Sequence, residues 1–355
     1  MLNRVRVYGE LVKAIPQWHQ GTCSAQEHAL LLWSVLSKGE YTLALRSLVE
    51  SRLGITWEGE LTQLTSLIPS NHPYRVVAID GSHCMPDHHE GSRAYLINIG
   101  VCAITYAEDA SSVQFFSEPS IYCTDEGSHS ESKIQAQRTC AELQAGIQDW
   151  DSTYTGDMIV TLYDGPLLPV ADITRNADLF SMVVSVMNCW QERQSVVIGY
   201  VSMPQSEYLM QLLHLASYEL LHEPCEWFLS DSQIGEIVIP HGNRLGLWRA
   251  LRPTIPDGIR IAWTYVRYGA EIIRLEFPEY LLNDRGRLEY VLGIVVDQVQ
   301  KGAGYPIALA EAHLQAVIAE PDRQFFYDCI AQILGYHGGA MHRSYKGARK
   351  RQIMI

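Results

Sequence analysis

Two aspartates, each followed directly by a glycine, are the residues of this sequence best suited to chemistry. Asp80 comes after an apolar run in RVVAIDGSH (75–83), and Asp164 comes after another in MIVTLYDGPL (158–167). An aspartate that ends a buried strand lies at the rim of a sheet, where the following glycine lets the chain turn and a ligand approach. On neighbouring strands, two such carboxylates repel each other unless a divalent cation lies between them. Asp-Gly is also a common turn pair, so a turn at each position is the simpler alternative.

The pair suits metal-assisted attack on a phosphodiester, provided that further donors join it. Oxygen donors favour Mg²⁺ or Mn²⁺ over zinc, and one or two such ions can activate water for in-line attack. The helical segment 130–150 supplies Glu131 and Glu142, and each could be the third carboxylate or an ordinary helix residue. His313, in AEAHLQAVI (310–318), could ligate a metal or move a proton to or from the attacking water.

The elements around these residues follow an order that is typical of an RNase H-like core. Between 75 and 203, short β-forming runs and segments of helical spacing alternate as β-β-β-α-β-α-β. Further on, 258–278 has the pattern of a hairpin, and 285–302 and 305–318 have the pattern of helices. We therefore predict an α/β protein with an RNase H-like mixed sheet core, a helical N-terminal extension and C-terminal helices.

Composition indicates a folded protein and excludes one class of DNA-binding protein. The 355 residues are 47% hydrophobic and 19% charged, which is too apolar for a disordered chain. The formal net charge of −13 is unlike that of a protein that binds DNA through a basic surface alone. The sequence shows no apolar run of membrane-spanning length, no signal-peptide core and no C-x-x-C pair among its eight cysteines. We therefore expect a cytoplasmic protein that does not enter a membrane.

Four motifs together resemble the NurA family of nucleases, which work with HerA-type hexameric DNA-translocating ATPases. The motifs are IDGSH (79–83), LYDGPL (162–167), IGYVS (198–202) and YPIALAEAHLQAVI (305–318). The resemblance implies an RNase H-like fold related to Piwi and Argonaute, and a Mn²⁺-dependent (or Mg²⁺-dependent) exo- and endonuclease that acts on DNA. It also implies a homodimer docked on a HerA-like ATPase, in DNA end resection or in phage defence.

The resemblance carries over to individual residues. Asp80 and Asp164 match the two metal-binding aspartates of the family, and His313 matches the histidine of its C-terminal motif. Glu142 is the better match for the helix glutamate because it lies in an Arg-x-x-x-Glu run, with Glu131 in reserve. All four of Asp80, Glu142, Asp164 and His313 are then expected to be both catalytic and metal-binding.

This chain also departs from the family pattern at two points, and the first is its second motif, which reads Asp-Gly-Pro (164–166) where Asp-Gly-Ser is usual. Ser202 and Met203 stand where the family often has a lysine, which puts phosphate binding in doubt but not metal binding. The family also has a tyrosine near its site, for which Tyr200 and Tyr265 are both candidates. The expected organisation is a helical extension over 1–70, a NurA-like nuclease domain over 71–320, and a C-terminal helix with a basic tail over 321–355.

Other functions remain open alternatives. A chain of this pattern could be a non-catalytic scaffold or regulatory subunit of a HerA-type motor that kept the fold. An aspartate-nucleophile phosphatase would need an aspartate at position 78, which is alanine, and an actin-like ATPase would need a glycine-rich loop after Asp164. The segment 82–92 is rich in histidine and acidic residues but lacks zinc-site spacing, so it is expected to be a polar loop near the active site.

Overall fold

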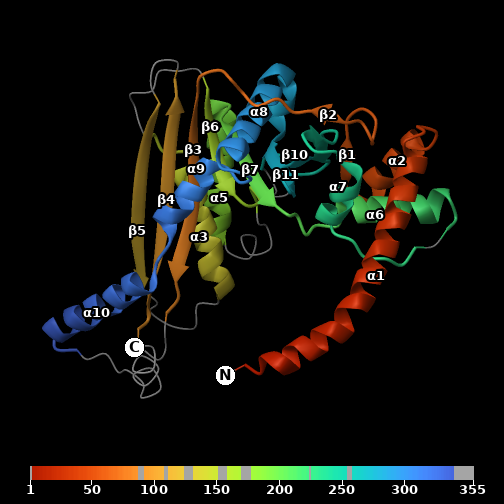
Figure 1. Ribbon diagram of the computed structural model, residues 1–355. Helices are drawn as coiled ribbons and strands as arrows, with labels where there is room; N and C mark the ends of the chain where they lie inside the picture. The colour runs from red at the N-terminus through yellow and green to blue at the C-terminus, as the bar shows by residue number, and fades with distance from the viewer. Residues whose placement is uncertain are drawn as a thin grey trace. The chain divides into compact units, whose positions relative to one another are not determined.

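A computed structural model describes residues 2–86, 92–107, 111–123, 131–150, 158–168, 177–223, 225–253 and 258–339. The chain forms two compact units (Figure 1). One, which we call the site unit, comprises Asn71–Val197 and Tyr305–Ile355, and it contains all four predicted site residues. The other, the companion unit, comprises Met1–Ser70 and Ile198–Gly304.

The site unit is built on four long strands in the order β6-β3-β4-β5. Strand β3 (Tyr74–Cys84) pairs antiparallel with β4 (Ala94–Tyr106), and β4 pairs antiparallel with β5 (Ser112–Cys123). On its other side β3 pairs in parallel with β6 (Ile159–Asp164). Most residues of β4 are buried, as expected for a strand covered on both faces, whereas most of β5 is exposed.

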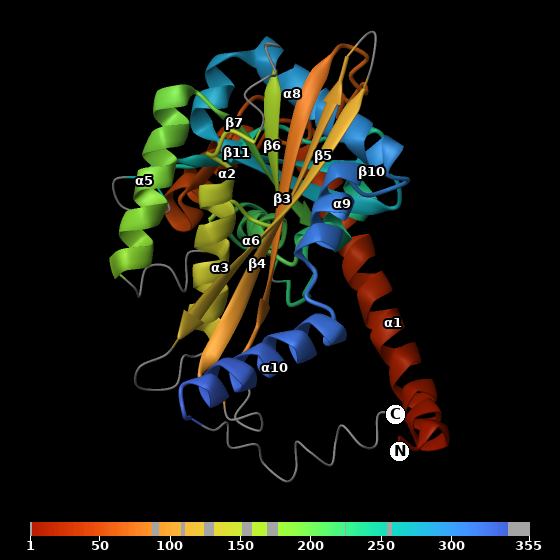
Figure 2. The same cartoon turned by 90° about the vertical axis from the view of Figure 1, so that its left-hand side faces the viewer.

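Helices cover the two faces of this sheet (Figure 2). Helix α3 (Glu131–Ala145) packs on one face of β3 and against α5 (Ala177–Arg193). Helix α9 (Ile307–Ala316) lies on the other face, over β3 and β4. It sits close to Gly100, where a side chain would place its Cβ 2.2 Å from the carbonyl oxygen of Ala312. Helix α10 (Glu320–Tyr336) follows and contributes Phe326 and Tyr327 to a small apolar cluster with Cys84.

The companion unit contains antiparallel strands of the sheet and a helical N-terminal part. Its strand order is β7-β11-β10-β9-β1, and β8 joins β10 to β2. A large apolar core includes Leu32, Leu45, Leu212 and Trp248. The elements are α1 (Arg4–Leu36), α2 (Thr42–Leu53), β1 (Ile55–Trp57), β2 (Thr65–Ser66), β7 (Val196–Ser202, whose first two residues belong to the site unit), α6 (Tyr208–Leu215), a π-helical turn (Ala216–Leu220), α7 (Asp231–Val238), β8 (Asn243–Arg244), β9 (Trp248–Ala250), β10 (Ile261–Tyr268), β11 (Glu271–Pro278), a 3₁₀ turn (Glu279–Asn283) and α8 (Arg285–Lys301).

The structure confirms the predicted element order and corrects one detail. The order β3-β4-β5-α3-β6-α5-β7 is the predicted β-β-β-α-β-α-β, and β10 and β11 form the predicted hairpin. The first aspartate does not end its strand, because β3 runs on through Asp80 to Cys84. The antiparallel ladder with β4, which extends over all of β3, holds Gly81 in the strand instead of releasing it as a turn.

Two further expectations concern the division of the chain into domains and the absence of membrane-spanning helices. The division into 1–70, 71–320 and 321–355 stays a prediction, and the basic tail at 346–351 lies outside the described residues. Among the helices described, none combines the length and apolar character needed to cross a membrane.

Candidate functional site

Asp80 and Asp164 lie side by side on neighbouring parallel strands. The last pair in the register of β3 and β6 is Ile79 with Tyr163, and the two aspartates follow directly on their strands. Residues at the same level of a parallel pair point to the same face, so both carboxylates project on the face that α9 covers. Gly165, immediately after β6, has a φ of +119°, a conformation that glycine adopts at little cost. The aspartates of the two Asp-Gly pairs therefore lie next to each other on the same face of the sheet.

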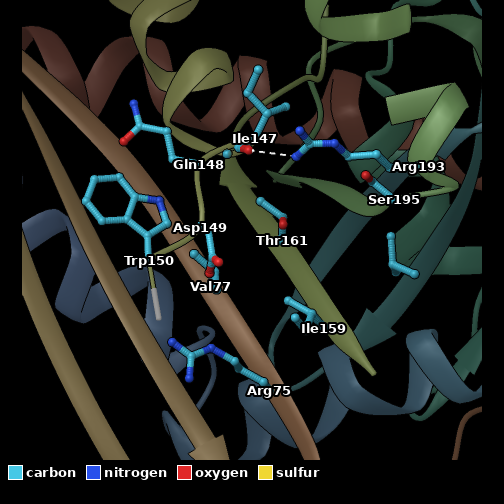
Figure 3. A pocket seen from close by; sticks show the side chains of 12 residues that line it. Arg75, Val77, Ile147, Gln148, Asp149, Trp150, Ile159, Thr161, Arg193 and Ser195 are labelled. Carbon is cyan, nitrogen blue, oxygen red and sulfur yellow. Dashed lines mark hydrogen bonds between the residues drawn. The ribbon is translucent and has the colours of Figure 1, made fainter. Parts of the chain in front are cut away.

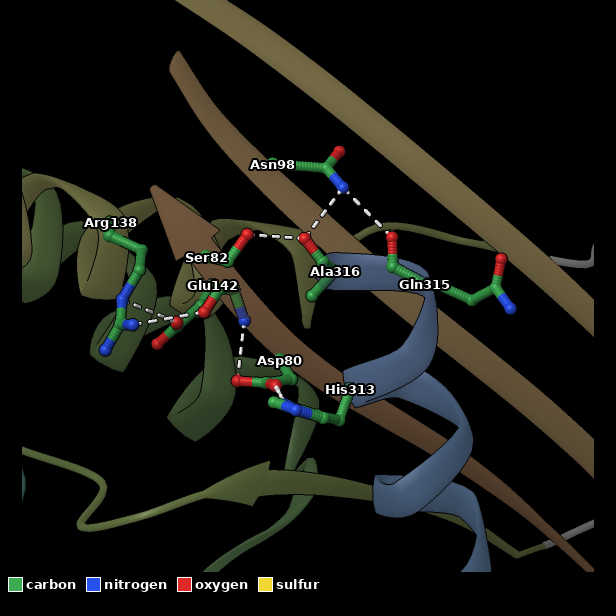
Figure 4. Close-up of polar contacts among 9 residues, drawn as sticks. Asp80, Ser82, Asn98, Arg138, Glu142, His313, Gln315 and Ala316 are labelled. Carbon is green, nitrogen blue, oxygen red and sulfur yellow. Dashed lines mark hydrogen bonds and ion pairs between the residues drawn. The ribbon is translucent and has the colours of Figure 1, made fainter. Parts of the chain in front are cut away.

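Glu142 approaches β3 from the opposite face, next to Gly81, which follows Asp80 in the strand. A Cβ on Gly81 would lie 2.5 Å from the Oε1 atom of Glu142, so only glycine lets this carboxylate approach the strand. Arg138, one turn earlier on α3, holds Glu142 through an ion pair of 3.2 Å. The same guanidinium donates a hydrogen bond of 3.1 Å to the carbonyl of Gly81, which fixes α3 against the strand (Figure 4).

Burial and neighbouring charges raise the pKa values of Glu142 and Asp164. The pKa of Glu142 is raised to about 7, chiefly by burial; the charge of Arg138 lowers it, and the charges of Asp80 and Asp164 contribute to the rise. The pKa of Asp164 is also raised, first by loss of solvent around it and then by Asp80, while a hydrogen bond from Tyr305 lowers it. Carboxylates whose pKa values are raised by burial and by a neighbouring negative charge are a common feature of metal and catalytic sites.

His313 and Tyr305 complete the cluster from the segment that forms α9. The Nδ1 atom of His313 lies 2.6 Å from Oδ2 of Asp80, and the imidazole is 59% exposed whereas Asp80 is only 13% exposed (Figure 4). Because a carboxylate only accepts hydrogen bonds, Nδ1 carries the proton and Nε2 is left to act toward solvent or a ligand. Tyr305 forms a hydrogen bond with Asp164 and directly precedes Pro306, the N-cap of α9.

Several residues that the sequence suggested for the site lie away from the acidic cluster. Glu131 is the first residue of α3, roughly 16 Å along the helix from Glu142, and it lies near His83. Tyr200 and Tyr265 are both fully buried in the companion unit, where Tyr265 donates a hydrogen bond to Asp231. The tyrosine beside the acidic cluster is Tyr305. It is the first residue of the motif YPIALAEAHLQAVI, so the sequence could have indicated it. Five residues of the polar segment (87–91) are outside the described part of the chain.

The donor set fits a hard divalent cation such as Mn²⁺ or Mg²⁺. Three carboxylates and one imidazole offer oxygen and nitrogen donors and no thiolate, and their mutual repulsion is the kind that a cation relieves. Within the described residues, no three acidic, histidine or cysteine side chains already surround a single point. Arg138 holds Glu142 through an ion pair, so a metal that took Glu142 as a ligand would draw its carboxylate away from Arg138.

A separate cavity of about 380 Å³ lies at the other end of the same strands (Figure 3). It is lined by Arg75, Trp150 and Arg193, among others, and Arg75 is roughly 17 Å along β3 from Asp80. Arg193 donates a hydrogen bond of 3.1 Å to the carbonyl of Ile147. Arg193 thus binds a carbonyl just beyond the C-terminal end of α3, where the helix dipole favours a cation. None of the four predicted site residues lines this cavity, so it is distinct from the acidic cluster.

Comparisons with known proteins agree with the motifs. The family model described as "NurA domain" matches residues 74–318, which include every residue of the cluster. No curated protein matches the chain. Three solved structures are similar, with TM-scores of 0.38 to 0.40: "Crystal structure of NurA" (11% identity, covering 74% of this chain and 90% of that one), "Crystal structure of NurA bound to dAMP and manganese" (11%, 80% and 92%) and "Crystal structure of NurA with manganese" (10%, 74% and 89%). On the family match over most of its length, the chain belongs to the NurA domain family.

Proposed function

We propose that this chain is a Mn²⁺-dependent (or Mg²⁺-dependent) deoxyribonuclease that hydrolyses phosphodiester bonds. The observation that carries the proposal is the assembly of Asp80, Asp164, Glu142 and His313 in one unit of a chain that belongs to a nuclease family. NurA has been crystallised with manganese and with dAMP. For this chain the choice of ion depends on its own donor set, which is hard and contains three carboxylates.

The residues of the cluster divide the work in this proposal. A bound divalent cation supplies a water of lowered pKa as nucleophile and offsets negative charge at the phosphate. Asp80 and Asp164 provide fixed negative charge from rigid strands, and Glu142 adds a third carboxylate held by Arg138. His313 donates through Nδ1 to Asp80, which fixes the ring so that Nε2 can bind the cation or take up a proton. Tyr305 favours the ionised form of Asp164.

The finer parts of the proposal concern the fold, the substrate and the partners. We assign the site unit to the RNase H-like folds because its β-β-β-α-β order places acidic residues on the first and fourth strands. DNA is the proposed substrate, and a HerA-like ATPase and a second copy of the chain are the proposed partners. A motor that delivers DNA would explain how a protein with a net charge of −13 acts on a polyanion.

A cleavage assay tests the proposal directly. Linear single- and double-stranded DNA would be incubated with the protein in Mn²⁺, Mg²⁺ or EDTA, with and without a HerA-like ATPase. We expect degradation in Mn²⁺ that EDTA abolishes and that Asp80→Ala and Asp164→Ala both lose. Absence of cleavage in every condition, with folded protein and the ATPase present, would instead favour the non-catalytic scaffold subunit.

A further inference from the structure

The last turn of α9 carries His313 and is attached to the sheet by side chains from two strands. The helix has ten residues, which is shorter than helices that are stable alone in water, so contacts with the sheet must hold it. His313 belongs to the final turn, because its own carbonyl accepts a hydrogen bond of 3.0 Å from the amide of Val317. The carbonyls that follow have no later helical amide to bind.

Asn98 on β4 supplies the missing donors. Its Nδ2 donates hydrogen bonds of 2.9 Å to the carbonyl of Gln315 and 3.0 Å to that of Ala316 (Figure 4). Its Oδ1 accepts a hydrogen bond of 3.0 Å from Ser117 on β5. Since carbonyls only accept, this orientation of the amide is the one that satisfies every partner. Asn98 is only 7% exposed, so water cannot readily replace these bonds.

Two neighbours of Asn98 limit the position of the helix further. Ser82, which lies opposite Asn98 on β3, also donates to the carbonyl of Ala316. Gly100 lies opposite Asp80, and a Cβ there would come within 2.3 Å of the amide nitrogen of Ala316. Helix α9 therefore packs directly on the backbone of Gly100, opposite Asp80. Hydrogen bonds from Asn98 and Ser82 hold its C-terminal end.

We propose that Asn98 is a positioning residue that acts through α9 to hold His313 against Asp80. His313 lies less than one turn before the two carbonyls that Asn98 binds, and the Nδ1–Oδ2 distance of 2.6 Å leaves little tolerance for a shift of the helix. The role deepens the proposed nuclease function and depends on it. No sequence motif points to Asn98, because the two carbonyls that it binds lie 217 and 218 residues further along the chain.

The test combines an isosteric variant with a double-mutant cycle. Asn98→Asp keeps the size of the side chain and the acceptor for Ser117 but replaces the donor nitrogen with an oxygen that repels two carbonyls. Single-turnover cleavage of linear DNA in Mn²⁺ would be measured for this variant, for His313→Ala and for the double variant. Asn188→Asp, on the exposed side of α5 in the same unit, is the matched control for the added charge.

We expect Asn98→Asp to slow cleavage about 10- to 100-fold, the cost of misplacing a reacting group by about 1 Å. In the His313→Ala background the same change should cost about twofold or less, because the group that Asn98 places is then absent. Gly100→Ala should give the same pattern by a steric route, and Asn188→Asp should match the wild type.

Two results would overturn the inference while leaving the proposed function intact. One is an Asn98→Asp protein as active as the wild type. The other is an equal loss in both backgrounds, which would show a general effect on folding instead of an effect through His313. A wild-type protein that cleaves nothing in Mn²⁺ would overturn the proposed function and this inference together.

Discussion

Replacement of Glu142 by glutamine should stabilise the protein while removing its activity. The pKa of Glu142 rises from an ordinary 4.5 to about 7, chiefly because the side chain is buried. The folded protein therefore holds a proton that the unfolded chain releases between these two values, and stability falls as the pH rises through that window. At roughly 1.36 kcal/mol for each pH unit, the full cost of ionised Glu142 is about 3 kcal/mol above pH 7. Glutamine has the shape of the neutral acid and avoids this cost.

Thermal or urea unfolding of the EDTA-treated protein as a function of pH measures this effect. The advantage of Glu142→Gln over the wild type should be about 1 kcal/mol at pH 5 and about 3 kcal/mol at pH 8. Mn²⁺ at about 100 times its Kd should add ~2.7 kcal/mol to the wild type and much less to the variant. A Glu142→Gln protein that is no more stable than the wild type at pH 8 would refute the electrostatic account of the acidic cluster.

Two further substitutions test the contacts around Glu142 and Asp164. Gly81→Ala would bring a Cβ within 2.5 Å of Glu142, so cleavage should fall at least about 10-fold, whereas Gly286→Ala, where the nearest atom is 3.6 Å away, should cleave DNA as the wild type does. Equal rates for the two glycine variants would contradict the close approach. Tyr305→Phe removes a hydrogen bond that lowers the pKa of Asp164, so loss of cleavage on acidification should begin at higher pH than in the wild type. A pH–rate profile measures this, and an unchanged acidic limb would count against the contact.

The main elements of the fold and the aspartate pair were predictable from local patterns. Apolar runs of strand length, a helix between them and an acidic residue at the same point of two runs predict Asp80 and Asp164 on neighbouring strands. The parallel register of β3 and β6 confirms that proximity. The prediction that β3 ends at Asp80 was wrong, since pairing with β4 over the whole strand outweighs the local turn preference of Asp-Gly.

The remaining site residues depend on contacts that spacing along the sequence does not show. Glu142 and Glu131 are both plausible from their helix, and only the packing of α3 on Gly81 places Glu142 at the cluster. Tyr305 was visible in its motif, but its partner Asp164 lies on a strand far away in the sequence. The ion pair of Arg138 with Glu142 is visible in the sequence as a spacing of one helical turn. The hydrogen bond that Arg138 donates to the carbonyl of Gly81 on β3 is not visible in the sequence.

The central claim is that Asp80, Glu142 and Asp164 form one metal centre, and a Mn²⁺ titration followed by electron paramagnetic resonance tests it most directly. The wild type and the variants Asp80→Asn, Glu142→Gln and Asp164→Asn would be compared, after unfolding curves show that each is folded. We expect saturable binding by the wild type and severely weakened binding by all three variants. Binding by the three variants that equals that of the wild type would contradict a shared metal centre.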